Sequence, residues 1–382
     1  MKTIALIGAT GSIGRQVLSV VRRYPDQFKI TSMVAHTSSE EFLSILEEFS
    51  PVYASLTDEK AGQALAHRIP QDIAFAYGEE AGLEAIDRAE IAFVAVSGFA
   101  GLRYSLHAIE KGKALALANK ETLVCGGELV MQKAREKGVD ILPVDSEHSA
   151  IWQALAFRKD TDFKRLVLTA SGGPFYGYTP QELQKVTPMS ALRHPTWQMG
   201  AKITIDSATL LNKGFEVIEA KWLYDAPLEK IHTVVHPQSI IHSMVEFNDG
   251  CVMAQMSYPS MDLPIQLALT YPKRLPCGVS SLDFEKLGSL RFLPLERKDF
   301  PCYDLALSSL ETGDNFPCAL NGAGEVAVHA FLKGQLPFTK IATVMEKTLE
   351  QTKRAKVDSY AVLKQTDERA RALAHASIGE GL

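Results

Sequence analysis

The order of apolar and polar residues divides the chain into two kinds of pattern. Over the first 145 residues, short apolar runs alternate with amphipathic segments at helical spacing. The apolar runs predict strands at Ile4–Ile7, Ile30–Val34, Val52–Leu56, Ile91–Val96, Ala114–Ala118 and Asp140–Val144. The segments between them predict helices that include Ser12–Arg23, Glu40–Phe49 and Tyr104–Lys111. Strands that alternate with helices are typical of a mostly parallel, doubly wound sheet.

Helical patterns dominate the end of the chain. They predict helices at Cys318–Leu332, Thr339–Gln351 and Ser359–His375, after a stretch rich in proline, glycine, serine and charge. A chain of 382 residues is also too long for one ordinary core. We therefore expect an α/β protein with a Rossmann-like doubly wound domain over 1–145, a central α+β domain over 146–274, a linker over 275–301 and a C-terminal α-helical bundle over 302–382.

Composition narrows the class of protein. A hydrophobic content of 46% and a charged content of 22% are typical of a soluble globular protein. The net charge of −5 gives no reason to expect nucleic acid or an anionic membrane as a partner. The sequence has no run of about eighteen apolar residues, and it opens on a strand rather than on a signal or transit segment. We therefore expect a cytoplasmic protein.

The five cysteines are scattered, odd in number and form no C-x-x-C pair. This argues against a disulfide framework and against a zinc knuckle. We expect five reduced thiols, at Cys125, Cys251, Cys277, Cys302 and Cys318.

A glycine-rich segment at 8–14 follows the first strand and opens the first helix. Its spacing is G-x-x-G-x-x-G, and small residues let the backbone approach a pyrophosphate. The helix start at Ser12 and Ile13 offers N–H groups and the positive end of the helix dipole. This position in the chain predicts a dinucleotide site, with a tight turn that binds nothing as the alternative.

The end of the second strand bears on which dinucleotide binds. An NAD site usually carries an acidic residue there for the ribose 2′-hydroxyl, but this chain has His36, Thr37 and Ser38. The lack of an acid favours NADP. No arginine or lysine follows to meet the 2′-phosphate, so these three side chains would serve as hydrogen-bond donors, with charge from His36 if it is protonated.

A polar triplet, Asn119-Lys120-Glu121, follows the strand that ends at Ala118. Ligands of open α/β sheets lie at the carboxyl ends of strands, so the triplet could contact the nicotinamide and a substrate. The alternative is a helix start, with Asn119 as the cap and Glu121 in the first turn. Both interpretations can hold together.

Two carboxylates, Asp145 and Glu147, flank Ser146 directly after the apolar run that ends at Val144. We expect a strand end that opens into a loop, where residues two apart point to the same side. Like charges aimed at one point need a neutralising group, and oxygen ligands suit Mg²⁺ or Mn²⁺. A solvated acidic turn is the alternative.

Functional side chains are dense between residues 170 and 216. The loop that starts at Ser171 and continues Gly-Gly-Pro is rich in N–H groups and suits an anion. The segment 193–200 holds Trp197 and Met199 between proline and glycine, which predicts a lid over a ligand, with core packing of Trp197 as the alternative.

Three donors further on, Ser207, Asn212 and Lys213, could share one phosphate. On a helix, Asn212 and Glu216 are four residues apart and face one way. Glu216 could then be a third oxygen ligand beside Asp145 and Glu147. A solvated helix pair of Lys213 with Glu216 is the alternative.

Seven motifs together resemble the 1-deoxy-D-xylulose 5-phosphate reductoisomerase family, over essentially the whole chain. They are G-A-T-G-S-I-G at 8–14, A-N-K-E-T-L-V at 118–124, P-V-D-S-E-H-S-A at 143–150, T-A-S-G-G-P-F at 169–175, H-P-T-W-Q-M-G at 194–200, D-S-A-T-L-L-N-K-G-F-E at 206–216 and H-P-Q-S-I-I-H-S-M-V-E at 236–246. The sequence departs from the family at 36–38, where the family commonly shows glycine, a basic residue and asparagine.

The resemblance implies a role for each matching residue. Divalent-metal ligands are Asp145, Glu147 and Glu216. Substrate contacts are Lys120, Ser146, Ser171, His194, Ser207, Asn212, Lys213 and Glu216, of which the serines, Asn212 and Lys213 mainly serve the phosphate. Contacts to NADPH are Thr10, Gly11, Ser12, Ile13, Asn119, Glu121 and Gly200. His36, Thr37 and Ser38 are predicted cofactor contacts from their position after the second strand, not from the resemblance. Catalytic groups are Lys120, Glu147 and His194. Trp197 and Met199 match the mobile flap, and Ser239 and His242 lie near the site.

The implied activity is the NADPH- and metal-dependent rearrangement and reduction of 1-deoxy-D-xylulose 5-phosphate to 2-C-methyl-D-erythritol 4-phosphate, in the non-mevalonate (MEP) isoprenoid pathway. The resemblance also implies a homodimer. Two other classes stay open at this point. A semialdehyde or acyl-phosphate dehydrogenase would need a nucleophilic cysteine such as Cys125, and a non-catalytic NADP-sensing protein would bind a dinucleotide without needing a metal.

Overall fold

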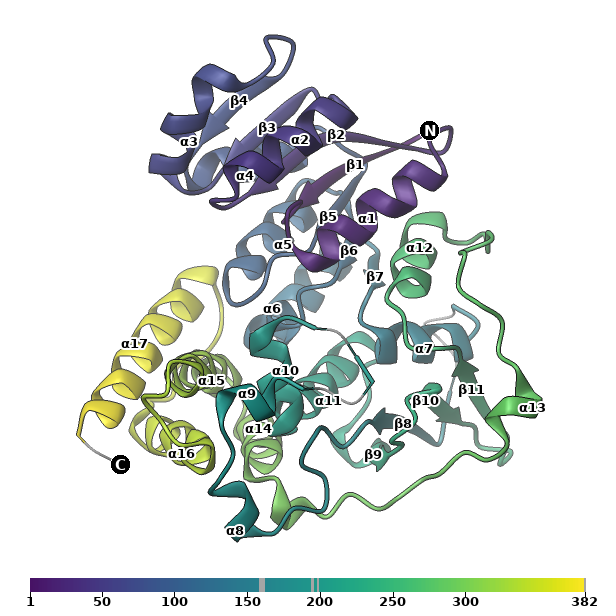
Figure 1. The fold of residues 1–382 in the computed structure, drawn as a ribbon, viewed down its shortest axis with the longest axis vertical. Coiled ribbons are helices and arrows are strands. Elements are labelled where there is room, and N and C mark those ends of the chain that lie inside the picture. The colour runs from purple at the N-terminus through teal and green to yellow at the C-terminus, as the bar shows by residue number, and fades with distance from the viewer. Residues whose placement is uncertain (158–161, 194–195, 198, 381–382) are drawn as a thin grey trace. The chain divides into compact units, whose positions relative to one another are not determined.

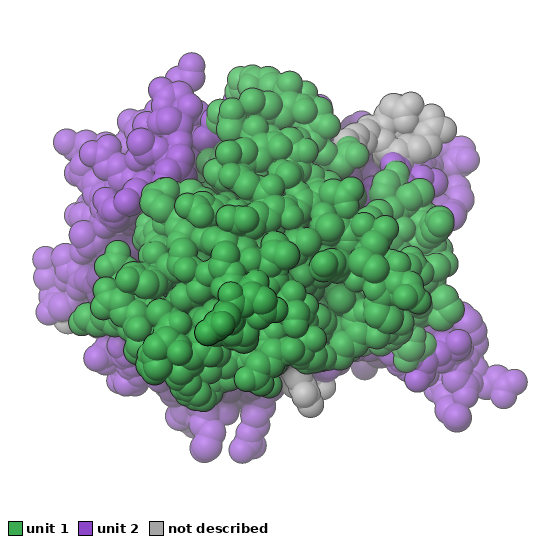
Figure 2. Space-filling view, turned by 90° about the horizontal axis from the view of Figure 1, so that it is seen from above, with its two compact units in different colours: residues 1–119, 130–145, 260–279 green, residues 120–129, 146–259, 280–382 purple. Residues whose placement is uncertain are grey.

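The computed structural model describes residues 1–157, 162–193, 196–197 and 199–380 (Figure 1). The chain forms two compact units, green and purple in Figure 2. Unit 1 comprises 1–119, 130–145 and 260–279, and unit 2 comprises 120–129, 146–259 and 280–382. The predicted borders at 145, 274 and 301 stay predictions, since compactness alone does not define domains that fold independently.

Unit 1 is built on a seven-stranded, fully parallel sheet in the order β4-β3-β2-β1-β5-β6-β7. Its strands are β1 (Lys2–Ile7), β2 (Phe28–Ala35), β3 (Tyr53–Leu56), β4 (Ala74–Tyr77), β5 (Ile91–Val94), β6 (Ala114–Leu117) and β7 (Ile141–Pro143). The helices between them are α1 (Ser12–Arg23), α2 (Ser39–Phe49), α3 (Glu59–Leu65), α4 (Glu79–Asp87) and α5 (Ala100–Glu110). The expected doubly wound parallel architecture is confirmed.

Strand β4 was not predicted from the sequence. It is an edge strand that pairs only with β3 among the described residues, and both of its end residues, Ala74 and Tyr77, are exposed. Its sequence, Ala-Phe-Ala-Tyr, is a short apolar run that follows Ile73 and ends at Gly78, so the sequence did contain a signal for this strand.

A segment from the middle of the chain completes unit 1. Helix α12 (Asp262–Thr270) packs on α1, and seven consecutive residues of it, 264–270, are buried. The Lys2 ammonium donates to the carbonyl oxygens of Leu269 at 3.1 Å and Tyr271 at 3.0 Å. The Gln266 amide donates to the Leu275 carbonyl at 2.8 Å. The two bonds from Lys2 tie the returning segment to the first strand, and the bond from Gln266 holds the segment together.

Unit 2 contains a mixed sheet in the order β11-β10-β8-β9. Its strands are β8 (Arg165–Ala170), β9 (Ile231–Val235), β10 (Ile241–Glu246) and β11 (Val252–Met256). Strands β8 and β9 are parallel, and β10 runs antiparallel to β8 and β11. Helix α7 (Ser146–Ala154) packs on β10 and β11.

The other helices of unit 2 are mostly short before residue 300 and long after it. They are α8 (Pro180–Leu183), α9 (Pro188–Ala191), α10 (Ala201–Ala208), α11 (Leu211–Leu223), α13 (Phe284–Leu287), α14 (Pro301–Thr312), α15 (Phe316–Leu332), α16 (Ile341–Gln351) and α17 (Tyr360–Gly379). Single 3₁₀ turns occupy Ala66–Arg68 in unit 1 and Leu228–Lys230, Arg297–Asp299 and Phe338–Lys340 in unit 2. Helices α15, α16 and α17 correspond to the three helices predicted at the end of the chain, and with α14 they confirm the expected C-terminal helices. Helix α6 (Glu121–Lys137) starts in unit 2, is kinked at Gly126 and ends in unit 1.

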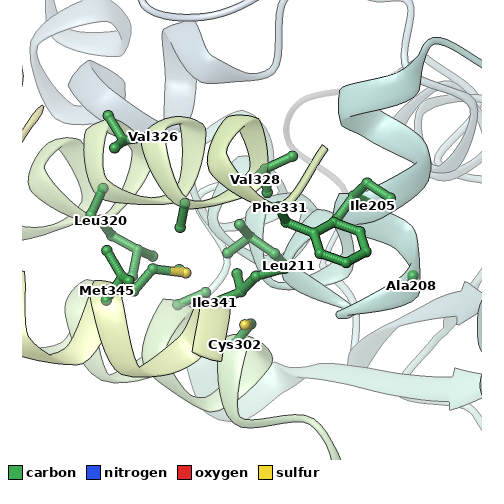
Figure 3. Packing of buried hydrophobic residues seen from close by; sticks show 14 of the residues in the cluster. Ile205, Ala208, Leu211, Cys302, Leu320, Val326, Val328, Phe331, Ile341 and Met345 are labelled. Atoms are coloured by element: carbon green, nitrogen blue, oxygen red, sulfur yellow. The ribbon is translucent and has the colours of Figure 1, made fainter. Parts of the chain in front are cut away.

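A buried apolar core fixes α11 against the C-terminal helices (Figure 3). Leu211 of α11 lies in one cluster with Phe331 of α15 and with Ile341 and Met345 of α16. A side chain at Gly324 would put its Cβ 3.1 Å from Leu211, so this glycine, although unfavourable in a helix, permits the close approach. Because α11 carries Asn212, Lys213 and Glu216, the core holds these side chains on a firmly packed element.

Two further expectations can be compared with the structure. All five cysteines are free thiols, as expected. Among the described residues, no helix combines the length and the apolar character that crossing a bilayer requires.

Candidate active site and metal centre

The segment Asp145-Ser146-Glu147 differs from its expected conformation. Strand β7 ends at Pro143 and helix α7 begins at Ser146, so Ser146 and Glu147 form a helical turn rather than a loop. The expectation of a strand end that opens into a loop was wrong. An acidic residue in the first turn is favoured by the helix dipole, and buried residues continue at His148 and Ile151 with helical spacing.

Three carboxylates nevertheless converge. Ligand oxygens of Asp145, Glu147 and Glu216 all lie within 4.8 Å of one another. Asp145 is the last residue before the chain enters unit 2, and its peptide bond to Ser146 keeps it beside Glu147. Three carboxylate oxygens at this separation suit a hard divalent cation such as Mg²⁺ or Mn²⁺. A second group of similar spread joins Asp145 to the buried pair His148 and Glu219.

Lys213 bridges two of these carboxylates. Its ammonium donates to Glu147 Oε1 at 2.8 Å, to the Thr169 carbonyl at 2.5 Å and to the carboxylate of Glu216. The side chains of Lys213 and Glu216 are only 4% and 1% exposed, so a solvated helix pair is the wrong interpretation. Burial lowers the pKa of Lys213, but the charges of Glu147 and Glu216 outweigh it and raise this pKa above its ordinary value.

A second lysine completes the polar cluster from another part of the chain. Lys120 Nζ donates to Asn212 Oδ1 at 2.6 Å and lies 3.3 Å from Glu216 Oε1. The Asn212 amide donates to the same Glu216 oxygen at 2.5 Å, in agreement with the expected helical spacing. Lys120, Asn212, Lys213, Glu147 and Glu216 therefore form one connected group.

The loop after β8 lies against the end of α10. Gly172 and Gly173 have φ values of +88° and +69°, which L-residues rarely adopt. A Cβ on Gly173 would lie 2.7 Å from the Ser207 carbonyl oxygen, so only glycine permits this approach. The Gly173 N–H donates to Ser171 Oγ at 3.2 Å, and Ser146 Oγ donates to the Glu147 carboxylate. Ser171 and Ser207 thus come from elements in direct contact.

His194 lies outside the described residues, but part of the expected lid is described. The Trp197 indole meets the His242 imidazole edge to face, with ring centroids 6.0 Å apart. His242 Nε2 lies 3.0 Å from Ser257 Oγ, and burial lowers the pKa of this imidazole. Thr196 Oγ1 lies 3.4 Å from Ser239 Oγ. The motif at 236–246 therefore contacts the segment 196–197.

In unit 1, the glycine-rich loop packs tightly between β1 and α1. A Cβ on Gly8, where φ is +97°, would lie 2.8 Å from the Ala95 carbonyl oxygen. A Cβ on Gly14 would lie 2.2 Å from the Gly8 carbonyl oxygen. Both positions require glycine for this close packing. The predicted cofactor contacts Thr10, Gly11, Ser12 and Ile13 occupy the loop and the start of α1.

The other predicted cofactor contacts are spread over both units. The buried Asn119 amide donates to the carbonyls of Val96 and Gly98, at 3.0 Å each, and so joins two strand-end loops of unit 1. In unit 2, Glu121 opens α6 and Gly200 precedes α10. Their proposed contacts with a dinucleotide stay predictions.

The residues at 36–38 follow β2, as expected. His36 is exposed, and its Nδ1 lies 2.8 Å from Thr57 Oγ1 at the end of β3. Ser38 immediately precedes α2. Sequence reasoning missed Thr57, because nothing in the sequence shows that these two strand ends are neighbours. It also missed Lys202, although the spacing of Lys202 and Asp206 by four residues on α10 was a usable signal.

Comparisons with known proteins give a consistent picture. Three family models match: 1-deoxy-D-xylulose 5-phosphate reductoisomerase at residues 4–127, the C-terminal domain of that enzyme at 141–224, and the DXP reductoisomerase C-terminal domain at 256–373. Relatives of that name from Chlorobium phaeobacteroides and Chlorobaculum tepidum are 48% and 45% identical. The first alignment covers 92% of both chains, and the second covers 99% of this chain and 100% of the relative.

Solved structures of the same enzyme match along the full chain. The Zymomonas mobilis reductoisomerase in complex with NADPH is 39% identical with a TM-score of 0.93, and the match covers 100% of both chains. A DOX-P reductoisomerase in complex with NADPH, fosmidomycin and magnesium is 36% identical with a TM-score of 0.94, covering 99% of this chain and 98% of that one.

Proposed function

Because the chain belongs to the 1-deoxy-D-xylulose 5-phosphate reductoisomerase family, we propose that it converts 1-deoxy-D-xylulose 5-phosphate to 2-C-methyl-D-erythritol 4-phosphate with NADPH and Mg²⁺ or Mn²⁺. This reaction serves isoprenoid precursor synthesis. The observation that carries the proposal is the buried cluster in which Lys213 bridges Glu147 and Glu216 beside Asp145. Burying several charged side chains together costs desolvation free energy, and such clusters are commonly found at functional sites.

The carboxylates of Asp145, Glu147 and Glu216 would hold the cation. A bound divalent cation supplies Lewis acidity toward the C2 carbonyl and the C3 hydroxyl of the substrate, and NADPH supplies the hydride that reduces the rearranged aldehyde. The surrounding side chains bind and orient. Ser171, Ser207, Asn212 and Lys213 would hold the phosphate, whose binding energy helps to fix the reacting carbons.

We expect proton transfer to be carried out by residues of the cluster around Lys213. The C3 hydroxyl must lose its proton when the carbon skeleton rearranges. Glu147 is one acceptor candidate because it precedes the buried part of α7 and is 18% exposed, which leaves it within reach of a ligand. Lys120 is the other candidate for moving this proton; its Nζ lies beside both Asn212 and Glu216, and it can accept a proton only as the neutral amine.

A product assay tests the proposed function. Purified protein is incubated with 1-deoxy-D-xylulose 5-phosphate, NADPH and Mg²⁺, and the product is identified by mass spectrometry and ¹³C NMR. The proposal predicts one branched polyol phosphate for each NADPH oxidised. Oxidation of NADPH that yields an unbranched product would contradict the rearrangement.

A nucleophilic cysteine is not favoured by the structure. Cys125 is 3% exposed, and burial raises the pKa of its thiol well above the ordinary value. The thiolate is the reactive form, so a thiol in this environment is a poor nucleophile. This weighs against a semialdehyde or acyl-phosphate dehydrogenase.

The proposal extends to a cytoplasmic homodimer. Strand β11 is at the edge of its sheet, and its residues Val252 and Met253 are 51% and 50% exposed. An apolar edge strand is commonly covered by another chain, and a second copy is the partner that the family resemblance suggests. Light scattering should give about twice the chain mass of 41.9 kDa. A monomer at working concentration would exclude the dimer.

We expect His36→Arg to tighten NADPH binding. His36 lies at the strand end that faces the adenosine ribose in this fold, and an arginine would add a permanent charge and a bidentate donor for the 2′-phosphate. The KM for NADPH should fall by about three- to tenfold, while the KM for NADH should change little. Steady-state kinetics with both cofactors measure this, and an unchanged KM for NADPH would contradict it.

A further inference from the structure

Lys202 of unit 2 has no role in the mechanism described above, although one of its ion-pair partners, Glu121, is a predicted NADPH contact. Lys202, in the first turn of α10, places Nζ 2.7 Å from Asp206 Oδ2 on the same helix and 3.5 Å from Glu121 Oε1 at the start of α6. The side chains of Asp206 and Glu121 are only 4% and 8% exposed. Such buried carboxylates need a counter-charge, and Lys202 provides it.

Lys202 lies in the field of three carboxylates. Glu325 of α15 is the third, and it is itself paired with Arg371 at 2.6 Å, so Asp206 and Glu121 are the two that depend most on Lys202. Burial opposes the charge of Lys202, but Asp206, Glu121 and Glu325 outweigh it and raise the pKa of this ammonium. Burial raises the pKa of Asp206, and Lys202 opposes that rise. Loss of the ammonium would remove the counter-charge that lies 2.7 Å from Asp206 Oδ2 and 3.5 Å from Glu121 Oε1.

The cluster joins two elements that carry predicted substrate contacts. Glu121 directly follows Lys120, whose ammonium contacts Asn212 and Glu216. Asp206 directly precedes Ser207, whose carbonyl is in close contact with the Gly173 loop. A shift of either carboxylate therefore moves a residue of the candidate site.

We propose that Lys202 is a positioning residue for the phosphate end of the substrate. Its ammonium holds the start of α6 against α10, and it neutralises carboxylates whose field would otherwise repel a phosphate dianion. Lys202 itself does not contact the substrate. This inference rests on the proposed function, because the phosphate is that of the proposed substrate.

Removal of the ammonium tests the inference. In Lys202→Met, the KM for 1-deoxy-D-xylulose 5-phosphate should rise about tenfold or more, with a smaller change in kcat. Lys202→Arg, which keeps the charge, should stay within about threefold of the wild type. Lys202→Met combined with Asp206→Asn should recover part of the lost affinity, because one unpaired carboxylate is removed with the ammonium.

Lys364→Met is the matched control. Lys364 also pairs with an acidic residue four positions on, Glu368, but on α17 and at an exposed position. This variant should keep the wild-type KM. Thermal unfolding of every variant distinguishes an effect on substrate positioning from an effect on stability. A purely structural role of Lys202 would lower Tm and leave KM unchanged.

The outcomes distinguish this inference from the proposed function. A wild-type protein that does not convert the substrate overturns the function. An active wild type whose Lys202→Met variant keeps its KM, or whose double variant binds no better than Lys202→Met, overturns the positioning role. Should Lys202→Met fail to fold, Lys202→Gln replaces it, with the same expected rise in KM and the same contradicting result.

Discussion

Replacing Glu216 by glutamine is expected to lower kcat/KM for 1-deoxy-D-xylulose 5-phosphate by about 10³-fold or more, equivalent to about 4 kcal/mol. Glu216 is 1% exposed and accepts hydrogen bonds from Lys120, Asn212 and Lys213. A glutamine keeps the shape of the side chain but loses the charge. It also replaces one carboxylate oxygen, which accepts hydrogen bonds, by an NH₂ group, which would face the donors of the neighbouring side chains. The affinity for the metal should therefore fall, and the neighbouring side chains should lose the hydrogen bonds that fix their positions.

Steady-state kinetics over a range of Mg²⁺ concentrations measure this effect. Binding of Mn²⁺, followed by electron paramagnetic resonance, should weaken in parallel. Glu346→Gln, an exposed change on α16, is the matched control, and Cys125→Ser should also keep full activity. Retained turnover together with retained Mn²⁺ affinity in Glu216→Gln would remove Glu216 from the proposed metal site. Loss of activity in Cys125→Ser would instead support the thiol-dependent alternative.

Replacing Lys213 by methionine is expected to have two opposite effects on ligand binding. The KM for the substrate should rise about 100-fold, because a buried ammonium assigned to the phosphate is lost. The affinity for Mg²⁺ should increase, because Lys213 now neutralises Glu147 and Glu216 and so competes with a cation. Without metal, the variant should lose about 3–5 kcal/mol of unfolding free energy, since the buried Glu216 and the partly buried Glu147 lose the ammonium that they share.

Thermal unfolding with and without Mg²⁺ measures the second effect. The rise in Tm caused by Mg²⁺ should be larger in Lys213→Met than in the wild type, because the cation replaces a missing counter-charge. Lys347→Met, an exposed change on α16, should match the wild type in both measurements. A weaker Mg²⁺ response in Lys213→Met would show that Lys213 supports the cation site instead of competing with it.

Much of the fold could be predicted because its pattern is local. Buried parallel strands such as β1 and β5 form apolar runs in the sequence, and Gly8 and Gly14 stand where an added Cβ would collide with backbone atoms. Strand β4 was missed although its residues Ala-Phe-Ala-Tyr form an apolar run, because the run is only four residues long and lies at the edge of the sheet. The order of the mixed sheet in unit 2 was likewise not predictable, since β8 pairs with strands more than sixty residues away.

The candidate site was predictable where spacing along one helix decides the geometry. Asn212 and Glu216 on α11 are the clearest case. Asp145 and Glu147 were assigned together for a reason that the start of α7 at Ser146 overturned, although their oxygens do converge. The bond from Lys213 to the Thr169 carbonyl depends on tertiary packing and could not be derived from spacing. The same holds for the contact of Lys202 with Glu121.

The most direct test of the account is the metal dependence of the reaction. The protein is treated with EDTA, desalted, and assayed for NADPH oxidation with 1-deoxy-D-xylulose 5-phosphate, before and after addition of Mg²⁺ or Mn²⁺. If Asp145, Glu147 and Glu216 hold a catalytic cation, activity should fall to background and return on addition of either metal. Unchanged activity after metal removal would contradict the central claim.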